Sequence, residues 1–294
     1  MILLTLNTSS IDAAIWHKGL ALKQIDLPLN KIAGIGDGEL DIPFLKSDLF
    51  AIGCPSNSRK KVISYMKENN GFIAKQPILE GFFEFVEHIK QKAGTEFNKI
   101  HLLTDKDGVI YKNPDLSHGA QFAKFIKQSG YTQPITKILT GSALYQCKDA
   151  GFIEAYGLTK ENLQDNEFIQ KDPYILLCES GAVQLNVLDH TDIKYLIDEK
   201  STPLLKVLLG EFKKTVLQRT EKELFAKFNL NWEQDYTKQH INRRGVHAVN
   251  RRTAVTINVP YDIRETDQGE IFRNTVFKIM KEETIRYDIP LTEI

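Results

Sequence analysis

Two pairs of aspartates in this sequence have the spacing to hold a cation. Asp105 and Asp107 follow the apolar run KIHLLT (99–104), and an extended backbone would project both side chains to the same side. Asp37 and Asp41 lie in the glycine-bracketed segment GIGDGELD (34–41), which lets both carboxylates face one point. Four carboxylates in one place repel each other strongly unless a cation is present. Hard oxygen ligands of this kind, together with a substrate phosphate, suit Mg²⁺.

A structural role is the alternative for each aspartate taken alone. An aspartate beside a glycine commonly caps a helix or starts a turn. That interpretation must also explain why both pairs follow apolar strands, and for the pairs together it is the weaker one. The sequence therefore predicts a magnesium site at the ends of two strands.

The elements that must position these residues alternate between strands and helices. Apolar runs of strand type are expected at 31–35, 48–52, 99–104, 136–139 and 174–178, and helices at 19–27, 58–69, 80–92 and 117–129. This alternation predicts a parallel sheet. Open sheets of this class place their ligands just beyond the carboxyl ends of the strands, where Asp37, Asp105 and Thr140 stand.

The pattern changes after about Leu188. Long amphipathic helices are expected at 203–227 and 268–286, with an alternating strand at 253–259 between them. Two short strands are expected at the start of the chain, at 2–6 and 11–16. Helices and strands paired in this way predict an α+β module rather than more of the parallel sheet.

Composition excludes several classes of protein. The 294 residues include 38 basic and 38 acidic side chains, which argues against binding nucleic acid or an anionic membrane through overall charge. No apolar run approaches the roughly 20 residues that span a bilayer, and the amino terminus is a poor signal peptide. The three cysteines are widely spaced and form neither a disulfide framework nor a zinc pair. We expect a cytoplasmic protein with neither nucleic acid nor membrane as a partner.

Several of these segments resemble the motifs of the haloacid dehalogenase superfamily. TDKDGVI (104–110) resembles its first motif, ILTG (138–141) its second and GDGELDIPFL (36–45) its fourth. HKGLAL (17–22) is similar to the segment that carries the lysine motif in the Cof-like sugar phosphatases. LCESGAV (177–183) is similar to the ENGA strand of that branch, with Ser180 in place of Asn. The strand TAVTINVP (253–260) and its flanking helices resemble the cap domain of that branch.

The resemblance implies an α/β fold, with a Rossmann-like parallel-sheet core at residues 17–187 and an α+β cap formed by 188–294 together with 1–16. It implies a Mg²⁺-dependent phosphatase for a small phosphorylated metabolite, with a sugar phosphate as the expected class. Asp105 would be the nucleophile and Asp107 the general acid and base. Thr140 would donate to a phosphoryl oxygen, and Lys18 would neutralise charge. Mg²⁺ would be held by Asp105, the backbone carbonyl of Asp107 and Asp37, with Asp41 in or near its shell.

Two positions depart from the motifs. Leu40 stands where Asn usually precedes the second aspartate of the fourth motif, and Lys106 stands where an apolar or aromatic residue is common. These departures keep one alternative open, a catalytically weak protein that keeps the fold and binds a ligand or partner. A phosphomutase of the same superfamily, which shares the core, is the second alternative. Substrate contacts are expected from Gly141 and from an arginine cluster that is otherwise a solvated face, formed by Arg243, Arg244, Arg251 and Arg252.

The order of the motifs is unusual. The family runs first motif, second motif, cap, lysine and fourth motif, whereas this chain runs lysine, fourth motif, first motif, second motif and cap. A circular permutation gives this order, with the old ends joined within 91–98 and the new ends at Ile294 and Met1. The alternatives are a misplaced start and end of the chain, or a swap in which residues 1–92 complete a second subunit. We therefore expect a monomer or a homodimer.

Overall fold

The chain divides into two units. The computed structural model describes residues 2–7, 10–25, 27–112, 114–197, 203–234 and 242–293. The central unit is His17–Tyr195, and the split unit combines Met1–Trp16 with Leu196–Ile294. The second boundary differs from the predicted one at 187/188, because residues 193–195 add a strand to the sheet of the central unit.

The central unit is built on an eight-stranded sheet with the order β10-β9-β8-β7-β6-β3-β4-β5. Neighbouring strands from β8 to β5 run parallel, and β9 and β10 are added antiparallel. The predicted parallel α/β sheet is therefore confirmed. The strands are β3 (Ile32–Ile35), β4 (Ala51–Cys54), β5 (Phe72–Ile73), β6 (His101–Asp105), β7 (Ile135–Leu139), β8 (Tyr174–Cys178), β9 (Val183–Asn186) and β10 (Ile193–Tyr195).

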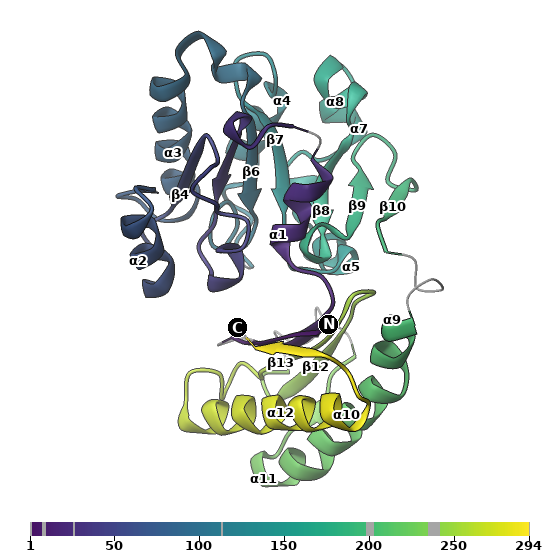
Figure 1. Cartoon of the computed structure of the whole chain (residues 1–294). Helices are drawn as coiled ribbons and strands as arrows, with labels where there is room; N and C mark the ends of the chain where they lie inside the picture. Colours follow the sequence, from purple (N-terminus) through teal and green to yellow (C-terminus); the bar gives the residue numbers. More distant parts are fainter. Residues whose placement is uncertain are drawn as a thin grey trace. The chain divides into compact units, whose positions relative to one another are not determined.

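Helices cover both faces of this sheet (Figure 1). The helices are α1 (Lys18–Ala21), α2 (Lys60–Glu68), α3 (Ile78–Ala93), α4 (Gly119–Lys127), α5 (Leu144–Asp149), α6 (Phe152–Ala155), α7 (Lys160–Leu163) and α8 (Glu167–Lys171). Short 3₁₀ segments add η1 (Leu22–Gln24), η2 (Leu29–Lys31), η3 (Glu39–Asp41), η4 (Gly94–Lys99) and η5 (Glu179–Gly181). Phe82, Phe122 and Phe152 anchor the larger core on one face, while Phe44 and Met66 belong to the core on the other. A sheet that is buried on both faces explains why its strands read as continuous apolar runs.

The strand order reverses between β3 and β6. From β3 the chain proceeds outward to β4 and β5, and from β6 it proceeds in the opposite direction to β7 and β8. α/β sheets of this type bind their ligands at such a reversal, beyond the carboxyl ends of the two strands, which here are β3 and β6. Asp37 and Asp105 stand at this point.

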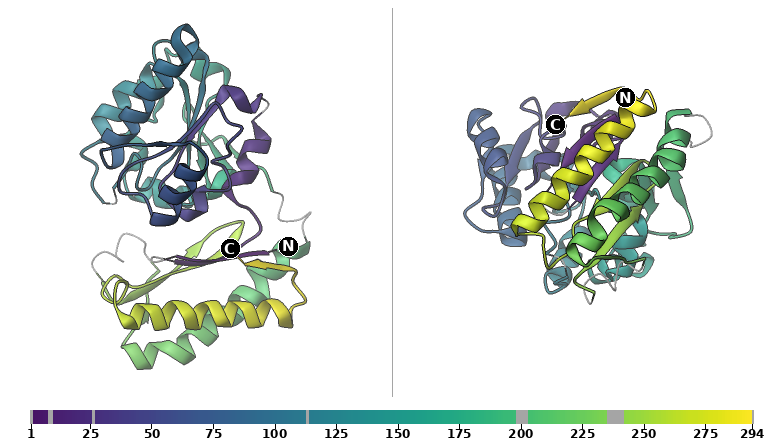
Figure 2. Two further views of the ribbon diagram at one scale, coloured as in Figure 1. Left: turned by 60° about the vertical axis from the view of Figure 1, so that its left-hand side comes forward. Right: turned by 90° about the horizontal axis from the view of Figure 1, so that it is seen from below.

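The split unit is a six-stranded sheet with the order β11-β12-β13-β2-β1-β14, and its helices lie on one face (Figures 1 and 2). The strands are β1 (Ile2–Leu6), β2 (Ser10–Ala14), β11 (Asn231–Trp232), β12 (Gly245–Asn250), β13 (Ala254–Asn258) and β14 (Leu291–Glu293). The helical segments are α9 (Pro203–Val207), η6 (Leu208–Phe212), α10 (Lys213–Thr220), η7 (Glu221–Phe225), α11 (Ala226–Phe228) and α12 (Asp267–Arg286). Segments η6 and η7 are π-helical.

The first and last strands of the described chain are neighbours in this sheet. β1 pairs with β14 in parallel, with Ile2 opposite Leu291, and with β2 in antiparallel. Both ends of the described chain therefore contribute to one sheet. Met1 and Ile294, the predicted ends of a permuted chain, lie outside the described residues. In the part of the chain that the structure describes, no helix combines the length and the apolar character of a membrane span.

Candidate active site at the carboxyl edge of the central sheet

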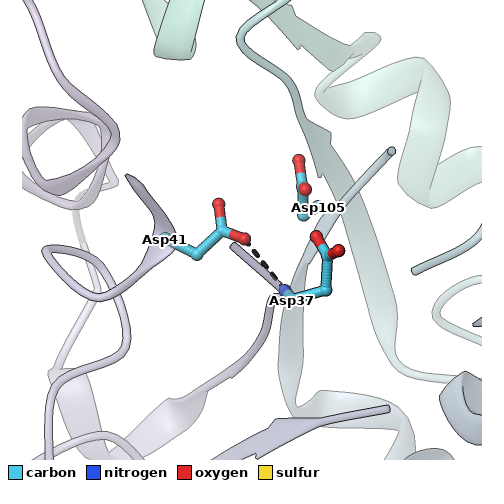
Figure 3. A group of neighbouring side chains, drawn as sticks. All are labelled: Asp37, Asp41 and Asp105. Carbon is cyan, nitrogen blue, oxygen red and sulfur yellow. Dashed lines mark hydrogen bonds between the residues drawn. The ribbon is translucent and has the colours of Figure 1, made fainter. Parts of the chain in front are cut away.

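Three aspartates meet where the strand order reverses. Asp105 is the last residue of β6, Asp37 follows β3 by two residues, and Asp41 ends η3. Asp37 and Asp41 come from one loop and Asp105 from β6, and Figure 3 shows the three side chains close together. One oxygen from each lies within 4.8 Å of the others, so the group could hold a metal ion. The predicted convergence of Asp37, Asp41 and Asp105 is thus present in the structure.

Asp41 folds the loop that carries Asp37. Its Oδ2 accepts hydrogen bonds from the backbone N–H groups of Asp37 and Gly38, each at 2.9 Å (Figure 3). The loop passes so close to Asp41 that a Cβ on Gly36 would lie 2.5 Å from the Asp41 Cβ. Gly36 is therefore needed for the close approach of this loop to the Asp41 side chain.

Lys18 forms ion pairs with both Asp41 and Asp105. Its Nζ lies 2.6 Å from Asp105 Oδ1 and 2.5 Å from Asp41 Oδ1, and its side chain is buried. Helix α1 can approach because a glycine follows the lysine, and a Cβ on Gly19 would lie 2.7 Å from the Pro43 carbonyl oxygen. The lysine thus reaches the ends of β6 and η3 from a helix that stands 87 residues before Asp105 in sequence.

Crowding of negative charge controls the protonation of this cluster. Burial raises the pKa of Asp105 well above its ordinary value, and the charge of Asp41 adds to the effect, while Lys18 opposes it. Burial and the charge of Asp41 also raise the pKa of Asp37, to about 7. Burial alone would lower the pKa of Lys18, but the charges of Asp105 and Asp41 outweigh it, and the pKa is raised. A divalent cation would relieve this repulsion.

The oxygens of the three aspartates are not equally available to a cation. Asp41 Oδ1 accepts a hydrogen bond from Lys18, and Asp41 Oδ2 accepts hydrogen bonds from two backbone N–H groups. The carboxylate of Asp37 accepts no hydrogen bond from the described residues, and Asp105 gives only Oδ1 to Lys18 among them. Asp37 and Asp105 are therefore the carboxylates that fit direct ligation, and Asp41 holds the lysine and the loop.

Asp107 is held on the other side of Asp105. Its Oδ2 lies 3.3 Å from Lys106 Nζ, 3.4 Å from Thr140 Oγ1 and 3.3 Å from Ser142 Oγ. Thr140 is itself fixed, because its hydroxyl accepts from the N–H of Ser142 at 3.0 Å. The structure thus brings the hydroxyls of Thr140 and Ser142 to the same oxygen of Asp107.

Two functional positions escaped the sequence analysis. Ser142 stands two residues after Thr140 on the same loop, and that spacing was a usable signal. Asn57 follows β4 and donates from Nδ2 to the carbonyl of Gly108 at 2.9 Å, while its Oδ1 accepts from the N–H of Ile78 at 2.8 Å. Gly108 has φ +81°, and a Cβ there would lie 2.1 Å from Asp37 Oδ2. Asn57 therefore fixes the backbone that packs against the Asp37 carboxylate.

Comparisons with known proteins leave the family open. No protein-family model, no curated protein and no solved structure matches this chain.

The remaining predicted substrate contacts are divided between the two units. Gly141 follows Thr140, and a Cβ there would meet open space, so this backbone is accessible. The four arginines all belong to the split unit. Arg243 Nε lies 2.6 Å and Arg244 Nε 3.4 Å from the carboxylate of Asp262, and Arg251 Nη1 lies 3.0 Å from Asp12. These ion pairs give three of the arginines a structural role, and a substrate contact by any of the four, Arg252 included, stays a prediction.

Proposed function

We propose that this protein is a Mg²⁺-dependent phosphatase of the haloacid dehalogenase type, acting on a small phosphorylated metabolite such as a sugar phosphate. The observation that carries the proposal is the buried Lys18, which bridges Asp105 and Asp41 with Asp37 beside them. A purely structural carboxylate cluster has no need of three aspartates around one buried lysine at the point where the strand order reverses. A site for phosphoryl transfer needs both the anionic nucleophile and the cation beside it.

The proposed reaction has two displacement steps at phosphorus. An oxygen of Asp105 attacks the phosphorus, and the bond to the leaving oxygen breaks as Asp107 gives that oxygen a proton. Water then gives its proton to Asp107 and attacks the aspartyl-phosphate, which releases inorganic phosphate and restores Asp105. Asp107 suits both steps because its side chain is about half exposed beside the buried Asp105.

The other residues would orient the phosphoryl group and neutralise its negative charge. Lys18 would balance the charge of Asp105 and of the phosphoryl group, and the hydroxyl of Thr140 would donate to a phosphoryl oxygen. Mg²⁺ would be held by Asp37, Asp105 and the backbone carbonyl of Asp107, with Asp41 next to it. When bound, the ion lowers the repulsion between an anionic nucleophile and an anionic phosphate.

We propose further that the split unit is the cap of such an enzyme and that the chain is circularly permuted. Along the chain, η4 connects the segment from β3 to α3 with the segment that begins at β6. It overlaps the range 91–98 that is expected for the old ends. Because β1 and β14 are parallel neighbours, a relative with the ordinary order would need a crossover of about a dozen residues or more between them. A permutant opened within η4 and closed with such a crossover should fold with unchanged activity. Failure of the permutant to fold with any linker would oppose this proposal. A dimer of the unaltered protein in sedimentation would favour the alternative, a swap between two subunits.

A ligand-binding protein without turnover is the competing proposal, and Lys106 beside Asp107 is the observation that favours it. Phosphate release from p-nitrophenyl phosphate with and without Mg²⁺ separates the two. Asp105→Asn should abolish Mg²⁺-dependent release, whereas Asp172→Asn, which changes a half-exposed aspartate paired with Lys137, should not. Full activity in Asp105→Asn would falsify the assignment, and net transfer of phosphate to a second alcohol would indicate a phosphomutase. Absence of both Mg²⁺ binding and turnover would favour the binding protein.

A further inference from the structure

Lys106 is a buried lysine placed between the two candidate catalytic aspartates. Only 3% of the residue is exposed. Its Nζ lies 3.3 Å from Asp107 Oδ2, 4.9 Å from the ring centre of Tyr111 and 5.2 Å from that of Phe152. The ammonium therefore rests on two aromatic faces and points toward Asp107, and both contacts compensate for part of its lost hydration.

The backbone directs this side chain inward. The carbonyl of Lys106 accepts from the N–H groups of Ile110 at 3.1 Å and of Tyr111 at 2.9 Å, which closes the loop after β6. The same turn places Tyr111 beneath the ammonium. The loop thus builds a seat for a cation from residues that follow the nucleophile directly.

Burial of the Lys106 ammonium in this position is energetically unfavourable in itself. Burying an ammonium is unfavourable unless it is well paired, and here the paired carboxylate is 48% exposed and would be solvated without the lysine. An apolar side chain in the same seat would pack on Tyr111 and Phe152 without this cost. Among its contacts, the ammonium gives Asp107 a charged partner that an apolar side chain would not supply.

Three donors converge on a single oxygen of Asp107. Lys106 approaches Oδ2 from the interior, and the hydroxyls of Thr140 and Ser142 approach from the loop after β7. None of these bonds involves Oδ1. A half-exposed aspartate would otherwise sample several rotamers. Lys106 and Ser142 still hold Oδ2 when Thr140 donates to a phosphoryl oxygen, so these two donors select one orientation.

We propose that Lys106 is a positioning residue for proton transfer: it clamps Oδ2 of Asp107 so that Oδ1 faces the leaving oxygen of the substrate. The inference rests on the proposed phosphatase function and deepens it. Lys106 contacts neither substrate nor metal in this role. Its effect should be largest for alkyl phosphates, because their leaving oxygen needs a proton, and smallest for nitrophenyl phosphate, whose leaving group departs as an anion.

The test compares Lys106→Met, Lys106→Arg and the matched control Lys137→Met. Lys137 is also a shielded lysine paired with an aspartate, Asp172, at 2.6 Å, but it touches none of the candidate site residues. Rates are measured with p-nitrophenyl phosphate and with an alkyl phosphate, together with KM, Mg²⁺ half-saturation and Tm. Lys106→Met should lower kcat for the alkyl ester by about tenfold or more, within the range of general acid catalysis. The same variant should change KM, Mg²⁺ half-saturation and the aryl rate by less than about threefold.

Further outcomes decide the proposal. Lys106→Arg should recover most of the alkyl rate, and Tm of Lys106→Met should equal or exceed that of the unaltered protein. Equal losses for alkyl and aryl esters, or a loss matched by Lys137→Met, would overturn the positioning role. If Lys106→Met does not fold, Ser142→Ala removes another donor from Oδ2 and must show the same selective loss. If the unaltered protein hydrolyses no phosphate ester, the proposed function itself fails and this inference falls with it.

Discussion

Replacement of Lys18 by methionine tests the electrostatic core of the site. Methionine preserves most of the length of the side chain and removes its charge. Two carboxylates that now lie 2.5 and 2.6 Å from the ammonium would be left facing each other in a buried place. Breaking a buried ion pair by removing one partner costs about 3–5 kcal/mol, because the remaining charge has lost its compensation. For a unit of this size that is a fall in Tm of about 6–20 °C.

The size of the loss should depend on pH and on Mg²⁺. Asp105 already has a raised pKa, and without the lysine its pKa rises further. A larger fraction of the Asp105 carboxyl would therefore be protonated at pH 5 than at pH 8, and Lys18→Met should lose less stability at pH 5 than at pH 8. Mg²⁺ should restore part of the stability at pH 8, since it supplies positive charge to the same oxygens.

Urea unfolding without metal at pH 8 and pH 5 measures these effects. Lys61→Met is the control, because Lys61 forms an exposed pair with Glu39 at 3.3 Å and should cost less than about 1 kcal/mol. The double variant Lys18→Met with Asp105→Asn removes one charge of each sign and should be more stable than Lys18→Met. A loss below about 1 kcal/mol at pH 8, or a loss that grows toward pH 5, would refute the reasoning.

The contacts and charges described above give four further predictions. Because the pKa of Asp37 is about 7, apparent Mg²⁺ affinity should be about tenfold higher at pH 8 than at pH 6. Calorimetry should show this difference in the unaltered protein, and Asp37→Asn should remove it. The metal-free protein should lose stability as pH rises from about 4 to 7, because the folded state holds the Asp37 proton more tightly than the unfolded chain does, and a stability that increases over that range would contradict it. Gly108→Ala should weaken Mg²⁺ binding at least about tenfold, whereas Gly94→Ala, also at positive φ but with no atom within 4 Å of the added Cβ, should leave Mg²⁺ binding unchanged and lose only about 1 kcal/mol of stability. Arg243→Ala should keep kcat/KM within about twofold, since its side chain is 67% exposed and its partner is Asp262, and a larger loss would assign it to the substrate.

The sequence predicted the main frame of the fold because the central sheet is buried on both faces. Its strands appear as uninterrupted apolar runs, and the runs at 99–104 and 174–178 match β6 and β8 closely. The predicted long helices at 203–227 and 268–286 are also present, although the first contains two π-helical segments. Strands such as β5 and β11 have only two residues each, too few for a periodic pattern. Helices α5 to α8 are similarly short and were not predicted.

The sequence predicted which carboxylates form the candidate site, but not the hydrogen bonds and ion pairs around them. Asp37 and Asp105 follow apolar strands, so the sheet alone brings them together. Asn57 was not predictable, because its role depends on the path of the Gly108 backbone, 51 residues away. Lys106 was noticed as a departure, but its burial depends on a turn that only the backbone hydrogen bonds define. Direction of side chains in loops is set by such local bonds, which composition and periodicity do not encode.

The division of the chain also has a kinetic consequence. Asp12 of β2 accepts a hydrogen bond from Thr256 of β13, 244 residues later, so the split unit depends on contacts of very long range. Closing a loop of that length is costly in entropy and slow. The central unit is continuous and makes its own contacts, so it can fold before the split unit is complete. Once folded, the central unit holds Lys18 and Tyr195 in fixed positions, so the residues between β2 and the later strands no longer have to close as a free loop. The central unit would then act as an internal scaffold for its neighbour, and a variant that slows its folding should delay both units.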